Sequence, residues 1–131
     1  MRRPTYSAAL MNDTKWREVL SLLRRLGMSF EVAYVWDERF RAPFSVMDMS
    51  LRDSHVADPG LGGGPTEYRD IFSIRIPRTL PSRNPRTGEV QQTIENSDRF
   101  LVEATKLGRL PLREEGGFIY LDGYSHRVEM R

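Results

Sequence analysis

Apolar side chains recur at helical spacing in two segments of the chain. In the first, residues 14–26, they form one continuous face: Trp16, Val19, Leu20, Leu23 and Leu26. Asn12 or Asp13 can accept a hydrogen bond from the free amides of the first turn, and Gly27 can end the helix in the left-handed conformation. A second stripe covers residues 97–107 and stops before a glycine. The pattern predicts two amphipathic helices.

Alternation of apolar and polar residues predicts four strands, at residues 29–37, 44–51, 68–76 and 118–122. The short loop between the first two strands favours antiparallel pairing. The last strand is apolar on both faces, which predicts a central position in the sheet. If the third and fourth strands are neighbours, the helix between them makes a crossover, and the two strands should be parallel.

Two segments between these elements are predicted to be irregular. Residues 52–67 include a glycine-rich run, and residues 77–88 contain three prolines, which cannot donate a backbone hydrogen bond. The resulting order is helix, strand, strand, strand, helix, strand. We therefore expect an α+β fold, a single domain with a mainly antiparallel sheet of about four strands and two helices on one face.

Length and composition agree with one domain. The chain has 131 residues, a net charge of +2 and no cysteine, which excludes disulfides and thiolate metal sites. We expect residues 1–11 to be a disordered leader, residues 12–124 the folded domain and residues 125–131 a polar tail, with Met11 as an alternative start. Because we find neither a signal peptide nor an apolar run of membrane length, we expect a cytoplasmic protein without membrane contact.

Three short motifs lie in the predicted elements. Residues 11–16 read Met-Asn-Asp-Thr-Lys-Trp, residues 68–71 read Tyr-Arg-Asp-Ile, and residues 121–124 read Leu-Asp-Gly-Tyr. Together they resemble a family of small bacterial proteins of unknown function that begin with Met-Asn-Asn/Asp-Thr-Lys-Trp. The resemblance covers residues 11–124, with the glycine-rich and proline-rich segments as insertions. It implies a compact bacterial domain, of a kind often encoded among contact-dependent toxin and immunity genes, and it implies no activity.

One loop groups a histidine with carboxylates. Asp53, His55 and Asp58 lie within six residues of one another. A neutral imidazole can act as a base or a metal ligand, and the two carboxylates could orient it or share a cation. The second histidine, His126, lies in the predicted tail. A solvated loop explains the grouping more simply, so we expect no catalytic residue, metal or cofactor. A metal-dependent enzyme or a small-ligand-binding domain built on this loop stays as an alternative.

Arginine and aromatic side chains outside the predicted core indicate a binding surface for another protein. We assign six residues to it: Trp36, Arg39, Arg41, Arg78, Arg83 and Arg86. The last three belong to a basic segment, residues 75–86, that contains no acidic side chain. Such a segment could also bind nucleic acid, but a net charge of +2 is small for a protein that neutralises phosphates. Nucleic-acid binding through residues 75–86 therefore stays as a second alternative.

The sequence contains no nucleophile motif and no phosphate-binding motif. We therefore predict a non-catalytic protein-binding module, and an immunity protein that neutralises a cognate toxin is its specific form. Inhibitors of basic nucleases are usually acidic and this chain is not, which disfavours a strongly basic nuclease as the toxin. The sequence leaves the partner's identity and the oligomeric state open.

Overall fold

A computed structural model describes residues 8–41, 51–57, 65–95 and 97–125. All of the predicted second strand except its last residue lies outside these ranges. So do Asp58, the glycine run at residues 60–64, and His126.

The main sheet has four strands: β1 (Glu31–Tyr34), β4 (Ile71–Pro77), β8 (Phe118–Asp122) and β7 (Leu112–Glu115). Their order is β1-β4-β8-β7, and every neighbouring pair is antiparallel. The predicted α+β class is confirmed, and β8 is central because it lies between β4 and β7. β1 ends at Tyr34, which leaves Trp36 outside the strand.

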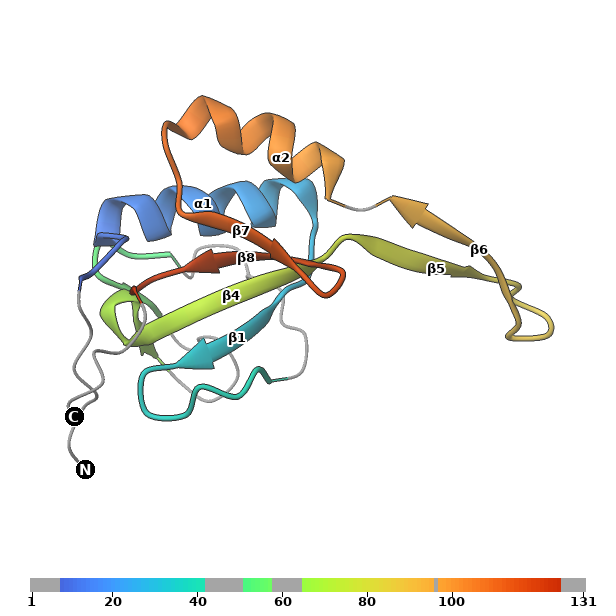
Figure 1. Cartoon of the computed structure of the whole chain (residues 1–131), viewed down its shortest axis with the longest axis horizontal. Coiled ribbons are helices and arrows are strands. Elements are labelled where there is room, and N and C mark those ends of the chain that lie inside the picture. Colours follow the sequence, from blue (N-terminus) through green and yellow to red (C-terminus); the bar gives the residue numbers. More distant parts are fainter. Residues whose placement is uncertain (1–7, 42–50, 58–64, 96, 126–131) are drawn as a thin grey trace.

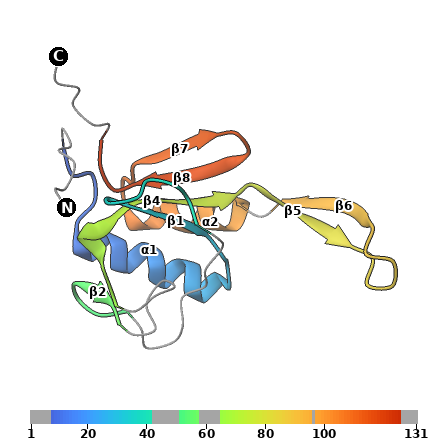
Figure 2. The same cartoon turned by 90° about the horizontal axis from the view of Figure 1, so that it is seen from below.

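Two helices in the described residues cover one face of this sheet (Figures 1 and 2). Helix α1 (Asp13–Leu26) begins after Asn12, whose Oδ1 accepts a hydrogen bond from the amide of Lys15 at 2.8 Å. It ends at Gly27, where φ is 67°. Helix α2 (Asp98–Ala104) is shorter than predicted and continues as the 3₁₀ turn η2 (Thr105–Leu107). The prediction of two helices on one face is therefore correct.

The core lies between the helices and the sheet. Alternate residues on β4, Ile74 and Ile76, point to the helices and are fully buried. Trp16 of α1 and Phe100 of α2 meet them there, with exposed fractions of 2% and 0%. The Nζ of Lys15 adds a polar contact by donating to the carbonyl oxygen of Leu107 at 2.5 Å, and so joins α1 to the end of η2.

The proline-rich segment forms a hairpin, so the prediction of an irregular segment at residues 77–88 is wrong. Strand β5 (Thr79–Arg83) pairs antiparallel with β6 (Val90–Glu95). Each proline occupies a place where a missing N–H is tolerated: Pro77 ends β4, Pro81 lies in a strand at an edge, and Pro85 lies in the turn. Figure 1 shows the hairpin projecting away from the rest of the molecule.

The strand β7 explains why β4 and β8 are antiparallel, which contradicts the parallel pairing expected for them. The expectation assumed that the crossover helix leads directly into residues 118–122. In the structure α2 and η2 lead first into β7, which is antiparallel to β8 and therefore runs parallel to β4. The sequence does not predict β7, and the turn that follows it reverses the chain into β8.

Two short strands, β2 (His55–Val56) and β3 (Thr66–Glu67), form a separate antiparallel pair. Both lie in the segment predicted to be a loop, residues 52–67. A 3₁₀ turn, η1 (Tyr68–Asp70), follows β3 and occupies the first three positions of the predicted third strand.

The two ends of the described chain meet. Ala9 and Tyr124 form an antiparallel bridge, and the amide of Leu10 donates to the carbonyl oxygen of Gly123 at 2.8 Å. Residues 8–10, which the sequence assigns to a disordered leader, are therefore paired with residues 123–125. Gly123 itself packs closely on the start of β4, because a Cβ atom there would lie 2.6 Å from the carbonyl oxygen of Ile71.

Candidate functional site

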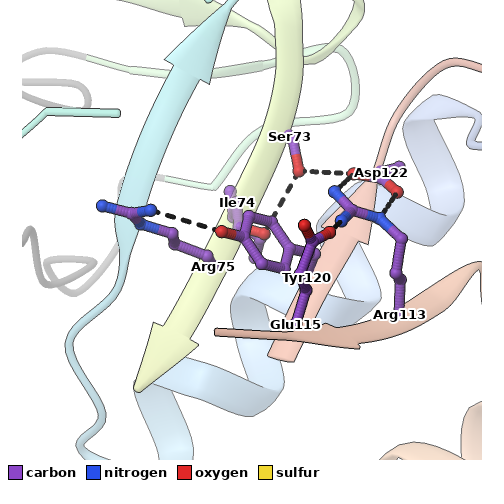
Figure 3. A network of polar contacts seen from close by, with 7 residues as sticks. All are labelled: Ser73, Ile74, Arg75, Arg113, Glu115, Tyr120 and Asp122. Carbon is purple, nitrogen blue, oxygen red and sulfur yellow. Dashed lines mark hydrogen bonds and ion pairs between the residues drawn. The ribbon is translucent and has the colours of Figure 1, made fainter. Parts of the chain in front are cut away.

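The sheet face turned away from the helices carries a network of arginine, aromatic and acidic side chains (Figure 3). They alternate with core residues along three strands: Ser73 and Arg75 on β4, Tyr120 and Asp122 on β8, and Arg113 and Glu115 on β7. The register places Arg75 opposite Tyr120, and Tyr120 opposite Arg113, so the side chains form a row across the sheet.

Arg75 is enclosed by the protein's own groups. Its guanidinium carbon lies 4.5 Å from the ring centre of Phe40 and 4.2 Å from that of Phe118. Its Nε donates to Glu31 at 2.8 Å, and its Nη1 donates to the hydroxyl of Tyr120 at 3.3 Å. Burial lowers the pKa of Arg75, but the hydrogen bonds to Tyr120 and Glu31 outweigh it and raise the pKa overall.

Arg113 is held in the same way at the other end of the row. Its guanidinium carbon lies 4.1 Å from the ring centre of Tyr120, and its Nε donates to Asp122 at 2.9 Å. The hydrogen bond from Arg113 to Asp122 is the main cause of the raised pKa of Arg113. Ser73 donates to the second carboxylate oxygen of Asp122 at 2.8 Å, and Glu115 pairs with Arg113. Both guanidinium groups are neutralised internally, so this face is better suited to stabilising the sheet than to binding a charged ligand.

A second cluster lies directly after β1, in a tight turn. The amide of Tyr34 donates to the carbonyl oxygen of Asp37 at 3.0 Å, and the amide of Asp37 donates back to Tyr34 at 3.1 Å. The turn stacks the ring of Trp36 on that of Tyr34, with centres 4.9 Å apart and planes 3° from parallel. Tyr34 is 7% exposed and Trp36 is 50% exposed, so the indole lies on the surface against a buried support.

Asp37 fixes the two arginines that follow. It accepts hydrogen bonds from Nε of Arg39 at 3.0 Å and from Nη2 of Arg41 at 3.2 Å. The hydrogen bond from the Arg39 side chain is the main reason that the pKa of Asp37 lies well below its usual range. Arg41 also lies 5.9 Å from the ring centre of Tyr34. We name the exposed part of this cluster, Trp36, Arg39 and Arg41, the Trp36 surface.

The other three predicted partner-binding residues lie elsewhere. Arg78, at the base of the hairpin, forms an ion pair with Glu114 of β7 at 3.1 Å. Arg83 and Arg86 lie at the exposed tip of the hairpin, where Arg83 donates to the carbonyl oxygen of Gly88 at 3.1 Å. The structure therefore divides the six predicted residues between the Trp36 surface and the hairpin.

The basic segment at residues 75–86 does not form one positive strip. Carboxylates neutralise Arg75 and Arg78, through Glu31 and Glu114 respectively. Of the four arginines in the segment, Arg83 and Arg86 are the two that no carboxylate neutralises in the described residues. Two positive charges are few for binding phosphates, so the structure gives the nucleic-acid alternative little support.

The predicted histidine loop is only partly described. His55 lies in β2 with its Nδ1 3.4 Å from the hydroxyl oxygen of Ser54. Asp53 forms an ion pair with Arg17 of α1 at 2.9 Å, and Asp58 lies outside the described residues. Across the described ranges, no three histidine, aspartate or glutamate side chains are grouped so that they could hold a metal ion.

A cavity of about 200 Å³ lies where the hairpin leaves the body. Its walls are mainly apolar and include Met28, Phe30, Pro77 and Leu80. The only acidic side chain in its lining is Glu31, which is already paired with Arg75. The cavity therefore offers space for an apolar side chain and no grouping of reactive atoms.

Sequence reasoning found Trp36, Arg39 and Arg41 but missed the residues that organise them. Asp37 precedes Arg41 by four positions and Arg39 by two, a spacing that could have indicated the ion pairs. Tyr34 lies in the core, and no sequence signal indicates that its ring supports Trp36.

Comparison of the chain with protein-family models, with curated proteins and with solved structures found no match. Neither of the helices described above is long and apolar enough to cross a membrane.

Proposed function

We propose that the protein is a non-catalytic protein-binding module and that its partner docks on the Trp36 surface. The observation that carries the proposal is the half-exposed indole of Trp36 stacked on the buried ring of Tyr34. Tryptophan, tyrosine and arginine are the residue types most enriched where binding energy concentrates in protein interfaces. Here all three occur within eight residues of one turn.

The turn also holds these side chains in place before any partner arrives. Trp36 is fixed by stacking, and Asp37 holds both guanidinium groups by hydrogen bonds. Side chains that are already ordered lose less conformational entropy on binding, so more of the contact energy is retained as affinity. The side chain of Arg39 is still 89% exposed, so a carboxylate or carbonyl group of a partner can reach it.

Neutralisation of a cognate toxin is the specific form of binding that we propose. An inhibitor needs a rigid surface and no chemistry of its own, and the Trp36 surface meets the first requirement. The metal-dependent alternative has less support because Asp53 is engaged by Arg17. The nucleic-acid alternative has less support because carboxylates neutralise Arg75 and Arg78.

The test is co-purification of the tagged full-length protein from its own host, followed by titration calorimetry with the recovered partner. We expect a stoichiometric complex, and we expect Trp36→Ala to weaken it by about 30-fold or more, as loss of an interface hot spot does. Val102→Ala is the matched control, because Val102 is 61% exposed and lies on α2. Recovery of no partner, or equal affinity of Trp36→Ala and wild type, contradicts the proposal.

A further inference from the structure

The segment that carries the Trp36 surface folds back along its own strand. After the turn that follows β1, the chain runs back beside it, and the amide of Arg41 donates to the carbonyl oxygen of Val32 at 3.0 Å (Figure 1). Arg39 and Arg41 are exposed in this segment, whereas Phe40 between them is partly buried. Phe40 therefore contacts the body of the protein at the point where its two neighbours face the solvent.

The ring of Phe40 lies on the sheet-face network. The guanidinium carbon of Arg75 lies 4.5 Å from its centre, and the ring of Tyr120 meets it edge to face, with centres 5.5 Å apart and planes 72° from parallel. Arg75 belongs to β4 and Tyr120 to β8, the two strands beyond β1 in the sheet order. An aromatic ring attracts a guanidinium group electrostatically as well as by apolar contact. Phe40 thus attaches the returning segment to the face of the sheet.

The guanidinium group under Phe40 is itself held in place. The ring of Phe118 lies 4.2 Å from its carbon atom, Glu31 accepts from its Nε at 2.8 Å, and the hydroxyl of Tyr120 accepts from its Nη1 at 3.3 Å. A side chain bound by a ring, a carboxylate and a hydroxyl group has little rotational freedom left. Phe40 therefore packs on a fixed support.

The ion pairs of Asp37 need such a support. The side chain of Arg39 is 89% exposed and that of Arg41 is 51% exposed, so water competes for both pairs. Ion pairs at the surface stabilise a conformation little, because ordering two long side chains costs entropy. The pairs form more readily when the backbone that carries the arginines is already fixed, and Phe40 lies between the two arginines.

We propose that Phe40 is a positioning residue of the Trp36 surface, and that its packing on Arg75 holds residues 39–41 where Asp37 can bind both guanidinium groups. The inference rests on the function proposed above, because the place of these arginines matters to a partner that docks there. The sheet-face network then supports the partner-binding turn besides joining the strands.

The first test uses the free protein and needs no partner. NMR relaxation of the Nε–H group of Arg39 should show an ordered side chain in the wild type and a flexible one, with an order parameter below about 0.6, in Phe40→Ala. Phe40→Leu keeps most of the apolar volume but has no ring face, so it should show the same loss of order. Phe40→Tyr keeps the ring and should behave like the wild type. Unchanged order of Arg39 in both Phe40→Ala and Phe40→Leu overturns the inference.

The titration of the Asp37 carboxyl group gives a second readout on the same variants. In Phe40→Ala the arginines should bind Asp37 less firmly, so the pKa of Asp37 should rise toward its ordinary value of 3.8. Phe40→Tyr should keep the lowered pKa of Asp37. An equally low pKa of Asp37 in Phe40→Ala contradicts the inference.

Phe118→Ala is the matched control. Phe118 contacts the same guanidinium group as Phe40 does, but it lies on β8 and outside the returning segment. The variant should lower the stability of the sheet and leave the order of Arg39 unchanged, because Phe40, Glu31 and Tyr120 still bind Arg75. Equal loss of order in Phe118→Ala and Phe40→Ala would mean that the sheet has loosened as a whole, which contradicts a specific role of Phe40.

The second test is titration calorimetry with the partner recovered by co-purification. Phe40→Ala should weaken the complex about fivefold or more, because two arginine side chains must then be ordered on binding. Phe118→Ala should bind like the wild type. If Trp36→Ala weakens the complex and Phe40→Ala does not, this inference is overturned and the proposed function stands. If Trp36→Ala binds like the wild type, the proposed function fails, and with it the role of Phe40 in binding.

Discussion

The body of the protein, which is the four-stranded sheet with its two helices, and the β5–β6 hairpin are both built from antiparallel strands. The body buries its apolar side chains, whereas the hairpin leaves them partly exposed. In the body, α1 and α2 cover one face of the sheet, and the residues that face them, such as Ile74 and Ile76, are fully buried. No helix covers the β5–β6 hairpin in Figure 1, and its Leu80 and Val90 are about half exposed. Strand pairing alone does not create a core, because apolar side chains leave water only where a second layer covers them.

The arginines show the same contrast. Arg75 and Arg113 contact aromatic rings on the sheet face, and carboxylates of the same molecule neutralise their charges. Arg39 is held by a single carboxylate in a turn and remains 89% exposed. The partly buried pairs of Arg75 and Arg113 join neighbouring strands of the body, whereas the exposed Arg39 is available to a partner.

The largest expected effect separates the body from the hairpin directly. Trp16→Ala should lower the free energy of unfolding by about 3–5 kcal/mol, because it empties a site that is 2% exposed at the centre of the core. Leu80→Ala on the hairpin should change it by about 0.5 kcal/mol or less. Urea unfolding followed by circular dichroism measures both. Equal losses would contradict the contrast, because they would mean that Leu80 is packed as tightly as Trp16.

Substitutions at two glycines, Gly123 in the body and Gly88 in the hairpin, test whether the two regions unfold independently. Gly123→Ala should destabilise the body by about 1–3 kcal/mol, because the added Cβ would lie 2.6 Å from the carbonyl oxygen of Ile71. Gly88, in the hairpin turn, has a φ of 75° and open space around it. Gly88→Ala should therefore strain only that turn, by about 1 kcal/mol.

Thermal unfolding and amide hydrogen exchange distinguish the two variants. Gly123→Ala should lower the midpoint of global unfolding. Gly88→Ala should leave this midpoint nearly unchanged and should speed exchange in β5 and β6 alone. A lowered midpoint in Gly88→Ala would show that the hairpin is coupled to the core.

Alkaline pH should act on the body through Tyr68, which is fully buried and donates to the carbonyl oxygen of Arg52 at 2.7 Å. Burial is the main cause that raises the pKa of this hydroxyl from 10.0 to about 12. The unfolded chain therefore loses the proton at a lower pH than the folded chain does. The contribution of Tyr68 to stability is complete below pH 10 and decreases as the pH rises from 10 to 12.

The measurement is the unfolding midpoint in urea as a function of pH, with Tyr68→Phe as the control. The variant loses the hydrogen bond at every pH but should lack the part of the alkaline decrease that Tyr68 causes. An identical alkaline decrease in both proteins would assign the effect to other groups.

The smallest expected effect concerns the turn that carries the Trp36 surface. The pKa of Asp37 is lowered by its hydrogen bond from Arg39, so the ion pairs contribute fully above the ordinary aspartate pKa of 3.8. Their contribution is lost as the pH falls through the lowered pKa of the folded state. An NMR titration of the Asp37 carboxyl carbon should place its midpoint below 3.8. Asp37→Asn should free Arg39 and Arg41 with little change in global stability.

The sequence predicted the elements that local signals specify. Asn12 caps α1 and Gly27 ends it, as expected from the preferences of helix ends, and the apolar face between them is buried. The apolar residues at 118–121 predicted the strand β8 and its central position, and the structure places β8 between β4 and β7 although only one of its faces is covered by the helices. The α+β class followed from these elements.

The strands that were not predicted from the sequence are stabilised by pairing with distant segments, which local patterns do not show. Pro81 argued against regular structure, yet it is tolerated in β5 because the edge on that side pairs with nothing in the described chain. β7 was missed because three of its four residues are charged, one arginine and two glutamates, so its alternation is weak; among the described strands it pairs with β8 alone. The missed strand β7 also reversed the predicted direction of β8 relative to β4.

The candidate site likewise has features that the sequence predicts and features that it does not. The sequence alone determined that Trp36 lies near a strand end with arginines close behind it, because these are facts of position along the chain. Only the tertiary structure decided that Tyr34 supports the indole, that Asp37 holds Arg39 and Arg41, and that Arg78 is neutralised by Glu114. Helix ends and strand alternation depend on neighbouring residues, whereas ion pairs, sheet edges and exposure depend on which distant segments fold against one another.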